Sequence, residues 1–389
     1  MQKPLRKSFL VFGKPFIEEI AEVTNTIKSG WWGTGPKTEA FEKKFAVYAR
    51  ARYALGVNSA TAGLHLALKA LGVGPGDEVI TTPLTFVSTA NVIVHCGAVP
   101  RFADVARDTW NIDPGQILKK ITRKTKVILP VHLHGRPCDM DRIMDIAKSR
   151  GIAVVEDAAH AAEAVYHGKK IGSIGDVTVF SFYVTKNIAT GEGGMVTTDN
   201  KKLYDLMRMM SLHGLSTDAY KRYSVRYYRQ YEAVVPGFKY NLTDIASSIG
   251  IHQLKRVETN RMIRKKQWEL YMRAFERVGE LTLPAHESPR TTHARHVFAV
   301  LLSSEKLRIT RDRFVDMLIK MNIGSGVHFN PVPLHAYYRK TFGFTAGMFP
   351  QAEFIGARTV SLPLGASLGT RDIHDVIRAV LWLVDMYRI

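Results

Sequence analysis

Several features that mark special classes of protein are missing from this chain of 389 residues. Cysteine is scarce, and Cys96 and Cys138 lack the paired spacing of a disulfide framework or a zinc site, so we expect no bound metal. No hydrophobic run approaches the ~18 residues of a membrane-spanning helix. The apolar stretch from Phe9 to Phe12 is too short for a secretory signal peptide. We therefore predict a soluble protein of the cytoplasm with no membrane-inserted segment.

Composition and charge leave the class of function open. Hydrophobic residues make up 46% and charged residues 23%, as in ordinary globular proteins, which argues against a disordered or fibrous chain. The 54 Lys and Arg against 35 Asp and Glu leave a formal charge of +19, which fits a nucleic acid, an anionic membrane or a phosphate-bearing substrate. The basic residues are scattered, and their one modest cluster, Arg261 to Lys266, fits the solvated face of a helix with Met262, Ile263 and Trp268 facing inward. We expect no nucleic-acid partner.

From about residue 50 to residue 210, short apolar strands alternate with amphipathic helices. The predicted strands are Tyr53–Val57, Asp77–Thr81, Val99–Phe102, Lys126–Leu133, Ile152–Glu156, Val177–Phe182 and Met195–Thr198. The predicted helices include Ala62–Leu71, Ser88–Cys96 and Asp139–Arg150. Alternation of this kind builds a mostly parallel sheet covered by helices on both faces. We therefore predict an α/β fold with a large domain, residues 1–250, around a mostly parallel seven-stranded sheet.

The pattern changes after residue 250. The predicted elements there are a helix at Ile251–Arg277, a strand at His296–Leu302, a helix at Arg311–Met321, a strand at Ser325–Phe329 and a helix at Asp372–Tyr387. They predict a smaller C-terminal α+β domain, residues 251–389. The segment Leu212–Asn241 is polar and aromatic and fits no element, and a loop of that length is usually functional or reaches a neighbour.

A lysine follows one of the predicted strands. Lys186 lies beyond the strand that ends near Phe182 and before Gly191–Gly194 (GEGG), and parallel sheets bind ligands at this carboxyl edge. An unperturbed lysine, with a pKa of ~10.4, is protonated and not nucleophilic at neutral pH unless a carbonyl cofactor captures it. The alternative is a solvent-exposed loop lysine, with glycines that simply let chains approach closely.

An acid and a histidine follow a second strand. Asp157 ends the apolar run Ile152–Glu156, and His160 comes shortly after it. A carboxylate at the end of a buried strand is costly unless a partner satisfies it. A protonated pyridine nitrogen would be such a partner, and the ion pair would keep the ring an electron sink. The alternatives are a helix cap for Asp157 and a satisfied core histidine for His160.

The turn Asn58–Gly63 (NSATAG) links a strand to a helix. Its small residues would let backbone N–H groups and hydroxyls surround a phosphate at the positive end of the helix. Ordinary N-capping by Ser59 or Thr61 explains the turn equally well. The hydroxyl of Ser181 could add to the phosphate site, and Phe86 could stack on an aromatic ring or belong to the core.

These features fall at the ends of strands of one sheet. A lysine, an acid, a phosphate-binding turn and an aromatic ring are the four parts of a pyridoxal 5′-phosphate (PLP) site in the aspartate-aminotransferase fold, PLP-dependent transferase fold type I. We therefore predict PLP as the cofactor.

Nearly the whole chain resembles the DegT-type nucleotide-sugar aminotransferases. The matching stretches, in order, are SGWWGTGPKTEAFEKKFA, NSATAGLHLALKALGVGPGDEVI, TFVSTAN, VHLHGRP, VVEDAAHA, GDVTVFSFYVTKNIATGEGG, PGFKYNLTDI and VSLPL. Within the family, NSATAG, EDAAHA, HGLSTDAY and PGFKYNLTDI most resemble the branch that aminates a UDP-4-keto-pentose to UDP-4-amino-4-deoxy-L-arabinose.

The resemblance implies roles around the cofactor. It implies that Lys186 binds the PLP aldehyde as an imine and that Asp157 pairs with the pyridine nitrogen. His160 is then near the phenolic oxygen, and Phe86 covers the ring. The implied phosphate ligands are Ala60, Thr61 and Ser181.

The resemblance also implies a substrate and an assembly. It implies transamination from L-glutamate to a nucleotide-linked keto sugar, in a homodimer where Asn241 reaches the neighbouring subunit's cofactor. The loop Trp31–Pro36, with Trp31 and Thr34, and His328 are expected to line the sugar pocket. The alternatives are a 4-keto-6-deoxyhexose or 3-keto sugar as substrate, or a non-catalytic regulator of the same fold.

This chain departs from the family pattern in two places and keeps it in a third. Many members read NYR where this chain has Asn241, Leu242 and Thr243, a departure that matches the amino-arabinose branch. A glycine that often stands near Glu163 is missing here. Lys186 is retained, whereas related dehydratases have histidine at this position, so the sequence favours amination over deoxygenation.

Overall fold

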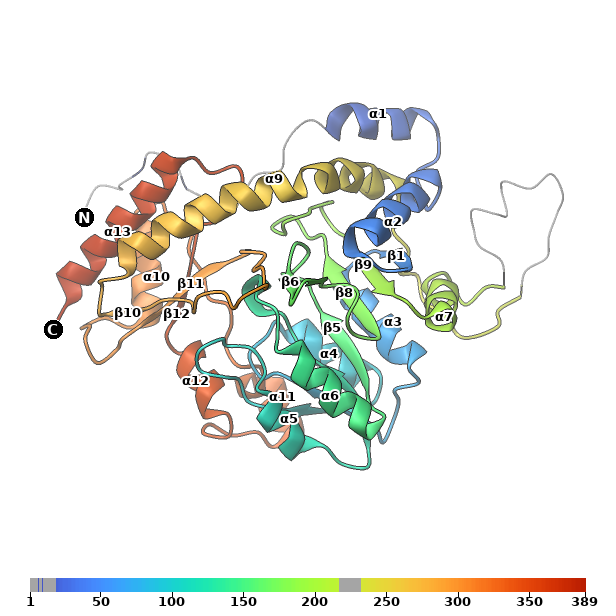
Figure 1. Cartoon of the computed structure of the whole chain (residues 1–389), viewed down its shortest axis with the longest axis horizontal. Coiled ribbons are helices and arrows are strands. Elements are labelled where there is room, and N and C mark those ends of the chain that lie inside the picture. Colours follow the sequence, from blue (N-terminus) through green and yellow to red (C-terminus); the bar gives the residue numbers. More distant parts are fainter. Residues whose placement is uncertain (1–5, 7–8, 10–18, 217–231) are drawn as a thin grey trace.

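A seven-stranded sheet forms the centre of the molecule (Figure 1). The computed structural model describes residues 6, 9, 19–216 and 232–389. In spatial order, the strands are β1 (Tyr53–Val57), β9 (Gly194–Thr198), β8 (Val177–Ser181), β5 (Ala153–Asp157), β4 (Thr125–Leu129), β2 (Glu78–Thr81) and β3 (Val99–Phe102). β9 is antiparallel to both of its neighbours, and the other pairings are parallel. The prediction of a mostly parallel seven-stranded sheet is confirmed.

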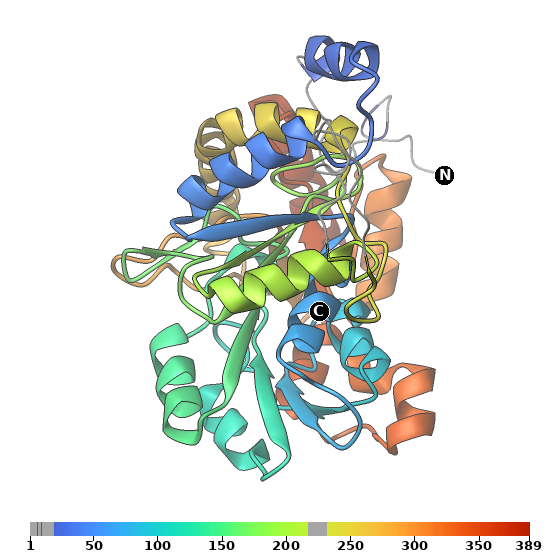
Figure 2. The ribbon, with the colours of Figure 1, turned by 90° about the vertical axis from the view of Figure 1, so that its right-hand side faces the viewer.

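Helices cover both faces of this sheet (Figures 1 and 2). One face packs against α2 (Pro36–Ala49), α5 (Pro114–Lys120), α6 (Met140–Arg150) and the first part of α9 (Asp244–Phe275). The other face packs against α3 (Ala60–Ala70), α4 (Val87–His95) and α7 (Lys201–Ser211). Because side chains alternate along a strand, Ile128 and Val154 enter the first core, and Val127 and Val155 enter the second. Burial on both faces explains why these strands read as continuous apolar runs.

A separate core surrounds a small antiparallel sheet of β10 (Leu281–Thr282), β11 (Phe298–Leu302) and β12 (Thr359–Leu362). The second part of α9, α10 (Arg311–Lys320) and α13 (Thr370–Tyr387) supply the rest of this core. Helix α9 passes between the cores, since Ile251 and Val257 pack in the large one, and Trp268 and Phe275 pack in the small one. The predicted domain boundary between residues 250 and 251 therefore lies within helix α9. The division of the chain into these two domains stays a prediction.

Some predicted boundaries differ from the structure for local reasons. The strand predicted at Lys126–Leu133 ends at Leu129, before Pro130, which has no N–H to donate to a ladder. The long helix begins at Asp244, because the Thr243 side chain caps it by accepting a hydrogen bond from the Ala246 N–H.

One predicted strand is wrong, and several elements were not predicted. Between Ser325 and Phe329 only Gly326 pairs, in a single bridge to Ser361, and the Ser–Gly pair has little strand preference. The unpredicted elements are α1 (Ile20–Lys28), α2, α7, α11 (Ala336–Phe342), α12 (Pro350–Gly356), β6 (Val165–Tyr166), β7 (Lys169–Lys170), β10 and β12. Residues 10–12 of the N-terminal apolar stretch, and residues 217–231 with the end of HGLSTDAY, lie outside the described residues.

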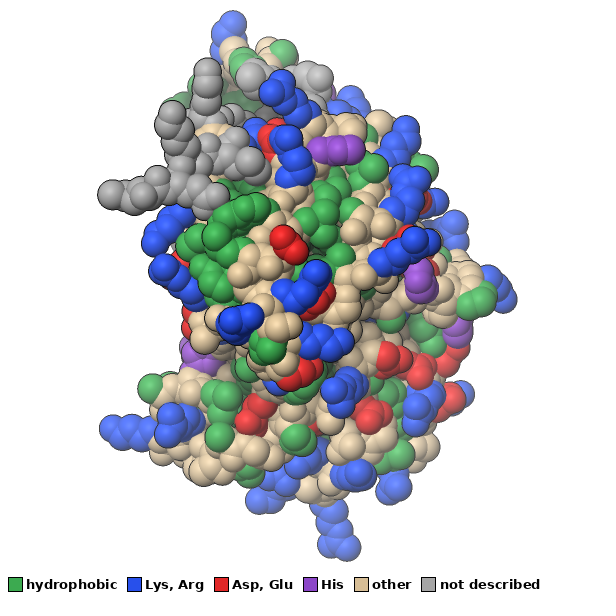
Figure 3. Space-filling model, turned by 90° about the vertical axis from the view of Figure 1, so that its left-hand side faces the viewer, with side chains coloured by type: hydrophobic (Ala, Val, Ile, Leu, Met, Phe, Trp, Pro, Cys, Tyr) green, Lys and Arg blue, Asp and Glu red, His purple; other side chains and the backbone are tan. Residues whose placement is uncertain are grey.

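The predicted solvated face of the Arg261–Lys266 segment is wrong in part. Arg264 is buried and Met262 is 43% exposed, so the burial of this turn is set by a polar partner of Arg264 rather than by hydrophobicity. Elsewhere on the surface shown in Figure 3, Lys and Arg side chains are spread among Asp and Glu. This dispersal supports a general contribution to solvation rather than one continuous basic surface on that face.

Over residues 6, 9, 19–216 and 232–389, no helix combines the length and hydrophobicity needed to cross a bilayer. In the same residues, His, Cys, Asp and Glu side chains form no group of three or more that could hold a metal ion.

Candidate active site

A cavity of about 350 Å³ opens where β5 and β8 end and where the connection from β1 to α3 begins. This is the carboxyl edge of the sheet, the usual ligand side of open α/β folds. The predicted residues that line it are Ala60, Thr61, Phe86, Asp157, His160, Ser181, Lys186 and His328. The fold thus brings together side chains from positions 60 to 328 of the chain.

Asp157 is the buried acid of this cavity. Its Oδ2 accepts a hydrogen bond from the Thr89 hydroxyl at 2.8 Å, and its Oδ1 accepts one from the Ala159 N–H at 3.1 Å. Burial nevertheless raises the pKa of Asp157, because these donors and the charge of Lys186 offset the desolvation only in part. The site therefore has a carboxylate that a further cation in the cavity would stabilise.

Lys186 lines the same cavity. Its backbone N–H donates to the Tyr183 carbonyl at 2.8 Å, which closes a turn directly after β8. Burial lowers the pKa of Lys186 to about 8, although the charge of Asp157 acts in the opposite direction. At pH 7.5 about a quarter of such an amine is neutral, against about 0.1% for an ordinary lysine. Lys186 can therefore act as a nucleophile and as a proton acceptor near neutral pH.

The start of α3 forms another wall. Ser59 caps the helix by accepting a hydrogen bond from the Ala62 N–H at 3.1 Å. The first N–H groups of a helix have no partner within it, so those of Ala60 and Thr61 are oriented to bind an anion. The hydroxyls of Thr61 and Ser181 belong to residues that line the same cavity.

Gly194 in the GEGG stretch explains how this turn reaches the sheet. A Cβ on Gly194 would lie 2.7 Å from the Phe180 carbonyl oxygen and 2.9 Å from the Ala60 nitrogen. The absence of a side chain at residue 194 therefore lets the turn lie against the strands. This is the close-approach role that the sequence left open for these glycines.

Aromatic rings surround the rest of the cavity. The His160 ring lies nearly parallel to Phe329, with centroids 6.1 Å apart, and Phe329 lies 6.0 Å from Phe86. Phe86 is 57% exposed, so it lies at the mouth of the cavity and not in the core. The backbone N–H of His134 donates to His160 Nδ1 at 3.2 Å. Burial lowers the pKa of His160 well below its usual value, so the neutral ring carries its proton on Nε2.

These groups match the chemistry of PLP. A buried carboxylate suits a protonated ring nitrogen, an amine of lowered pKa suits an aldehyde, and helix N–H groups with hydroxyls suit a phosphate. Together they support a site for this cofactor.

The family comparison decides the identity. The DegT/DnrJ/EryC1/StrS aminotransferase family matches residues 17–381. The chain belongs to this family. The predicted resemblance is thereby confirmed, and this chain is a PLP-dependent nucleotide-sugar aminotransferase.

Relatives of this aminotransferase cover nearly its whole length. It is 48% identical to the spore coat polysaccharide biosynthesis protein SpsC of Bacillus subtilis (strain 168). The similarity extends over 379 residues, which are 96% of this chain and 97% of SpsC. The putative sugar aminotransferase Spr1654 from Streptococcus pneumoniae, in its PMP form, has a TM-score of 0.91 at 34% identity over 97% of this chain and 99% of that chain. Its PLP form has a TM-score of 0.89. Helicobacter pylori PseC, an aminotransferase involved in pseudoaminic acid biosynthesis, has a TM-score of 0.90 at 27% identity over 98% and 100% of the two chains. These neighbours confirm the predicted fold class.

Three predicted residues of the aminotransferase lie outside the Lys186 cavity. The Trp31 indole donates to the Thr34 carbonyl at 3.1 Å, and the Asn241 amide donates to the Thr34 hydroxyl at 2.6 Å. Thr34 and Asn241 line a second cavity of about 210 Å³. Within one chain, the structure therefore does not bring Trp31, Thr34 and Asn241 to Lys186.

Other residues of the site were not predicted. Thr89, which holds Asp157, lies in the quoted stretch TFVSTAN and in helix α4, but nothing local in the sequence pairs it with the acid at the end of β5. Phe329 contacts His160 from the segment between α10 and β12, and His134 contacts it from the loop after β4. The quoted stretch VHLHGRP contains His134 and could have indicated it, whereas Phe329 has no such signal.

Proposed function

We propose that this aminotransferase moves the amino group of L-glutamate to the keto carbon of a nucleotide-linked sugar, with a UDP-4-keto-pentose as the first candidate. The observation that carries the proposal is that Lys186 and Asp157 line one cavity and influence each other electrostatically. An amine of lowered pKa and a buried acid in one enclosed site are the groups that amino transfer requires.

Lys186 is the proposed catalytic base and acid. When bound, PLP stores the amino group and stabilises the negative charge that develops as a C–H bond breaks. The Lys186 Nζ takes a proton from the α-carbon of the donor and later delivers a proton to the sugar carbon that receives nitrogen. Positioned proton transfer of this kind contributes about 10²–10⁴-fold to the rate.

The other residues of the cavity would hold and orient the cofactor. Asp157 would balance the charge of a protonated ring nitrogen, and His160 would donate from Nε2 to an anionic ring oxygen. Phe86 would cover the ring at the exposed mouth of the cavity. The proposed phosphate ligands are Ala60, Thr61 and Ser181.

We propose that the active site is completed by a second copy of the chain. Asn241 bridges to Val57 of β1 and lines the second cavity with Thr34. A homodimer would place this group of residues at the partner's cofactor, with Trp31 and Thr34 facing the sugar together with His328. The location in the cytoplasm stays a prediction of the sequence.

The choice of sugar rests on the motifs that favour a UDP-4-keto-pentose. The similarity to SpsC, a spore coat polysaccharide biosynthesis protein, supports an amino sugar made for a polysaccharide. The similarity to PseC, which is involved in the biosynthesis of pseudoaminic acid, keeps a different sugar open as the alternative. The surplus of positive charge favours a substrate with a diphosphate.

Two experiments test the function. Sodium borohydride should erase a visible absorption band and fix the cofactor on Lys186, and Lys186→Ala should abolish turnover; full activity of that variant would refute the assignment. The purified pyridoxamine form should then be mixed with UDP-, GDP- and dTDP-linked keto sugars. Return of the visible band with the UDP-4-keto-pentose alone would support the first candidate, and return only with a hexose would replace it.

A complementation experiment tests the shared site. Lys186→Ala and Asn241→Asp should each be inactive alone. Mixed and refolded together, half of the dimers are hybrids with one intact site, so about a quarter of the wild-type activity should return. Absence of any recovery from a mixture that forms hybrids would refute the sharing of Asn241.

A further inference from the structure

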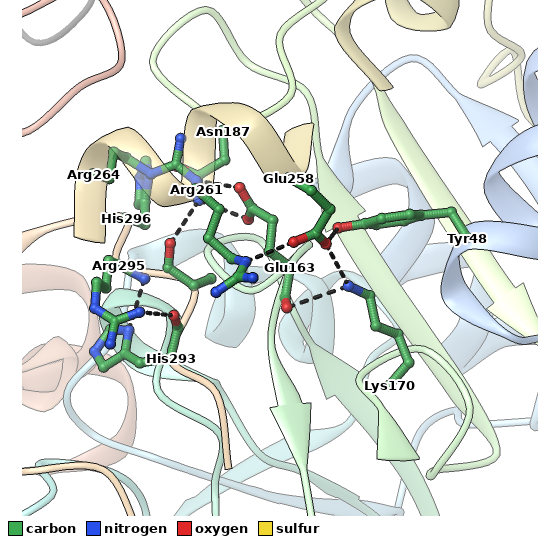
Figure 4. Close-up of polar contacts among 11 residues, drawn as sticks. Tyr48, Glu163, Lys170, Asn187, Glu258, Arg261, Arg264, His293, Arg295 and His296 are labelled. Carbon is green, nitrogen blue, oxygen red and sulfur yellow. Dashed lines mark hydrogen bonds and ion pairs between the residues drawn. The ribbon is translucent and has the colours of Figure 1, made fainter. Parts of the chain in front are cut away.

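A buried polar network contains Glu163, Arg264 and Asn187, the residue that follows Lys186 in the chain (Figure 4). Arg264 of α9 forms an ion pair with Glu163, and their side chains are 4% and 0% exposed. Taking both charges out of water is costly, and removing one partner of such a pair leaves an uncompensated buried charge. Each charge therefore holds the other in place.

Asn187, the residue after Lys186, connects this ion pair to the active site. Its Nδ2 donates to Glu163 Oε2 at 2.8 Å and to the Ala294 carbonyl at 3.3 Å. Because both partners can only accept hydrogen bonds, the atom that faces them is the amide nitrogen. The amide oxygen therefore faces the other way. There it accepts a hydrogen bond from His296 Nδ1 at 3.0 Å (Figure 4).

This contact determines the tautomer of His296. Burial, together with the charge of Lys186, lowers the pKa of His296 well below its usual value, so the ring is neutral. Because Nδ1 donates to Asn187, the proton lies on Nδ1 and Nε2 is left as an acceptor. The His296 ring lies against His160, with centroids 4.5 Å apart.

The charged groups around this network come from several elements. On the outer side, Lys170 donates to the Glu163 carbonyl at 3.2 Å and pairs with Glu258, which also contacts Tyr48 and Arg261. On the inner side, the cations that act on His296 are Lys186 and Arg264, and the titratable rings there are His328 and His134, whose pKa values burial lowers to about 4 and about 3. Over the described part of the chain, Glu163 is the only carboxylate that contacts Asn187.

We propose that Glu163 and Asn187 are positioning residues for amino transfer. The ion pair with Arg264 orients Glu163, Glu163 orients the Asn187 amide, and Asn187 anchors the backbone next to Lys186 and sets the tautomer of His296 beside His160. This inference rests on the proposed role of Lys186. It also means that α9, which packs in both cores, contributes to the placement of the catalytic amine.

The test removes the Asn187 side chain, which connects Glu163 to His296, and leaves the ion pair between Glu163 and Arg264 intact. In holoenzyme carrying Asn187→Ala, kcat should fall about 10- to 100-fold, the effect of a displacement of about 1 Å at the reacting group. The KM for the amino donor should not change, and the pH midpoint of the cofactor's visible band should shift. Tyr48→Phe, which removes a contact of Glu258 in the outer part of the network, is the matched control and should change none of these values.

A second measurement needs neither activity nor cofactor. In ¹⁵N spectra of histidine-labelled apoprotein, with His296 assigned through a His296→Gln variant, the wild type should show a proton on Nδ1. Asn187→Ala should show a mixture of tautomers, and Asn187→Ser provides the same test if the alanine variant does not fold.

Different results would refute the proposed function and the positioning role. A wild type that does not retain cofactor on Lys186 after borohydride would refute the proposed function. A wild type that does retain it, with an Asn187→Ala variant of unchanged kcat, pH midpoint and tautomer, would overturn only the positioning role.

Discussion

Replacing Asp157 by asparagine separates the charge of this residue from its shape. The Ala159 N–H can still donate to the new side-chain oxygen, and the Thr89 hydroxyl, which also contacts Thr85, can rotate to accept from the new amide. Because burial raises the pKa of Asp157, the ionised form is costly in the folded apoprotein. A folded pKa above the unfolded one means that this residue lowers stability once the pH exceeds both values. Near pH 7, apo Asp157→Asn should therefore be at least as stable as the wild type.

The effect on the holoenzyme should have the opposite sign. With PLP bound, Asp157 would face a buried cation, and an unpaired buried charge costs about 3–5 kcal/mol. The rate of the half-reaction with the amino donor should therefore fall about 100- to 5,000-fold.

The assay is the loss of the visible cofactor band after mixing with L-glutamate, alongside thermal unfolding of the apoprotein. Asp176→Asn is the matched control, since its carboxylate accepts from the Val154 N–H at 2.8 Å at the other end of the sheet and lies outside the cavity. A rate for Asp157→Asn above about a tenth of the wild-type rate, or a clear loss of apoprotein stability, would refute the electrostatic reasoning.

Two further predictions concern the amine and the phosphate-binding turn. Burial lowers the pKa of Lys186 to about 8, so its charged form is disfavoured in the folded apoprotein and its contribution to stability improves as the pH rises from about 8 towards the value of a free lysine. Lys186→Met should therefore raise the Tm of the apoprotein at pH 7 and raise it less at about pH 10, and an equal effect at both would contradict this. Gly194→Ala should weaken PLP binding in a fluorescence titration, because its Cβ would press on Ala60, whereas Gly74→Ala, with no atom within 4 Å, should bind normally.

Much of the fold could be predicted because strong local patterns were present. The strands around Val127 and Val154 are apolar on both faces, which is the pattern of a buried parallel sheet. Helix α2 was missed because its buried side includes Thr38 and Glu42, whose places depend on partners far along the chain, such as Asp244 for Thr38. The strand at Ser325–Phe329 failed because Val327 and Phe329 are only partly buried against the hydrophobic clusters, and Gly326 alone forms a bridge.

Some residues of the candidate site could likewise be predicted from the sequence, and others could not. Lys186, Asp157 and the turn at Ala60 and Thr61 could be selected because each lies at or shortly after the end of a strand of one sheet, and the topology of such a sheet brings strand ends together. The pairing of Thr89 with Asp157 could not, because no period in a sequence records which hydroxyl of a helix meets which acid at the end of a strand.

The sequence by itself determined the chemistry of this protein: the amine, the acid, the phosphate-binding turn and the family that unites them. Only the tertiary structure decided the state of those groups. Burial sets the protonation of Lys186 and Asp157, and Arg264, which a linear reading places in solvent, is buried because Glu163 meets it there. The physical reason is that desolvation and ion pairing depend on distances through space, and folding alone establishes those distances.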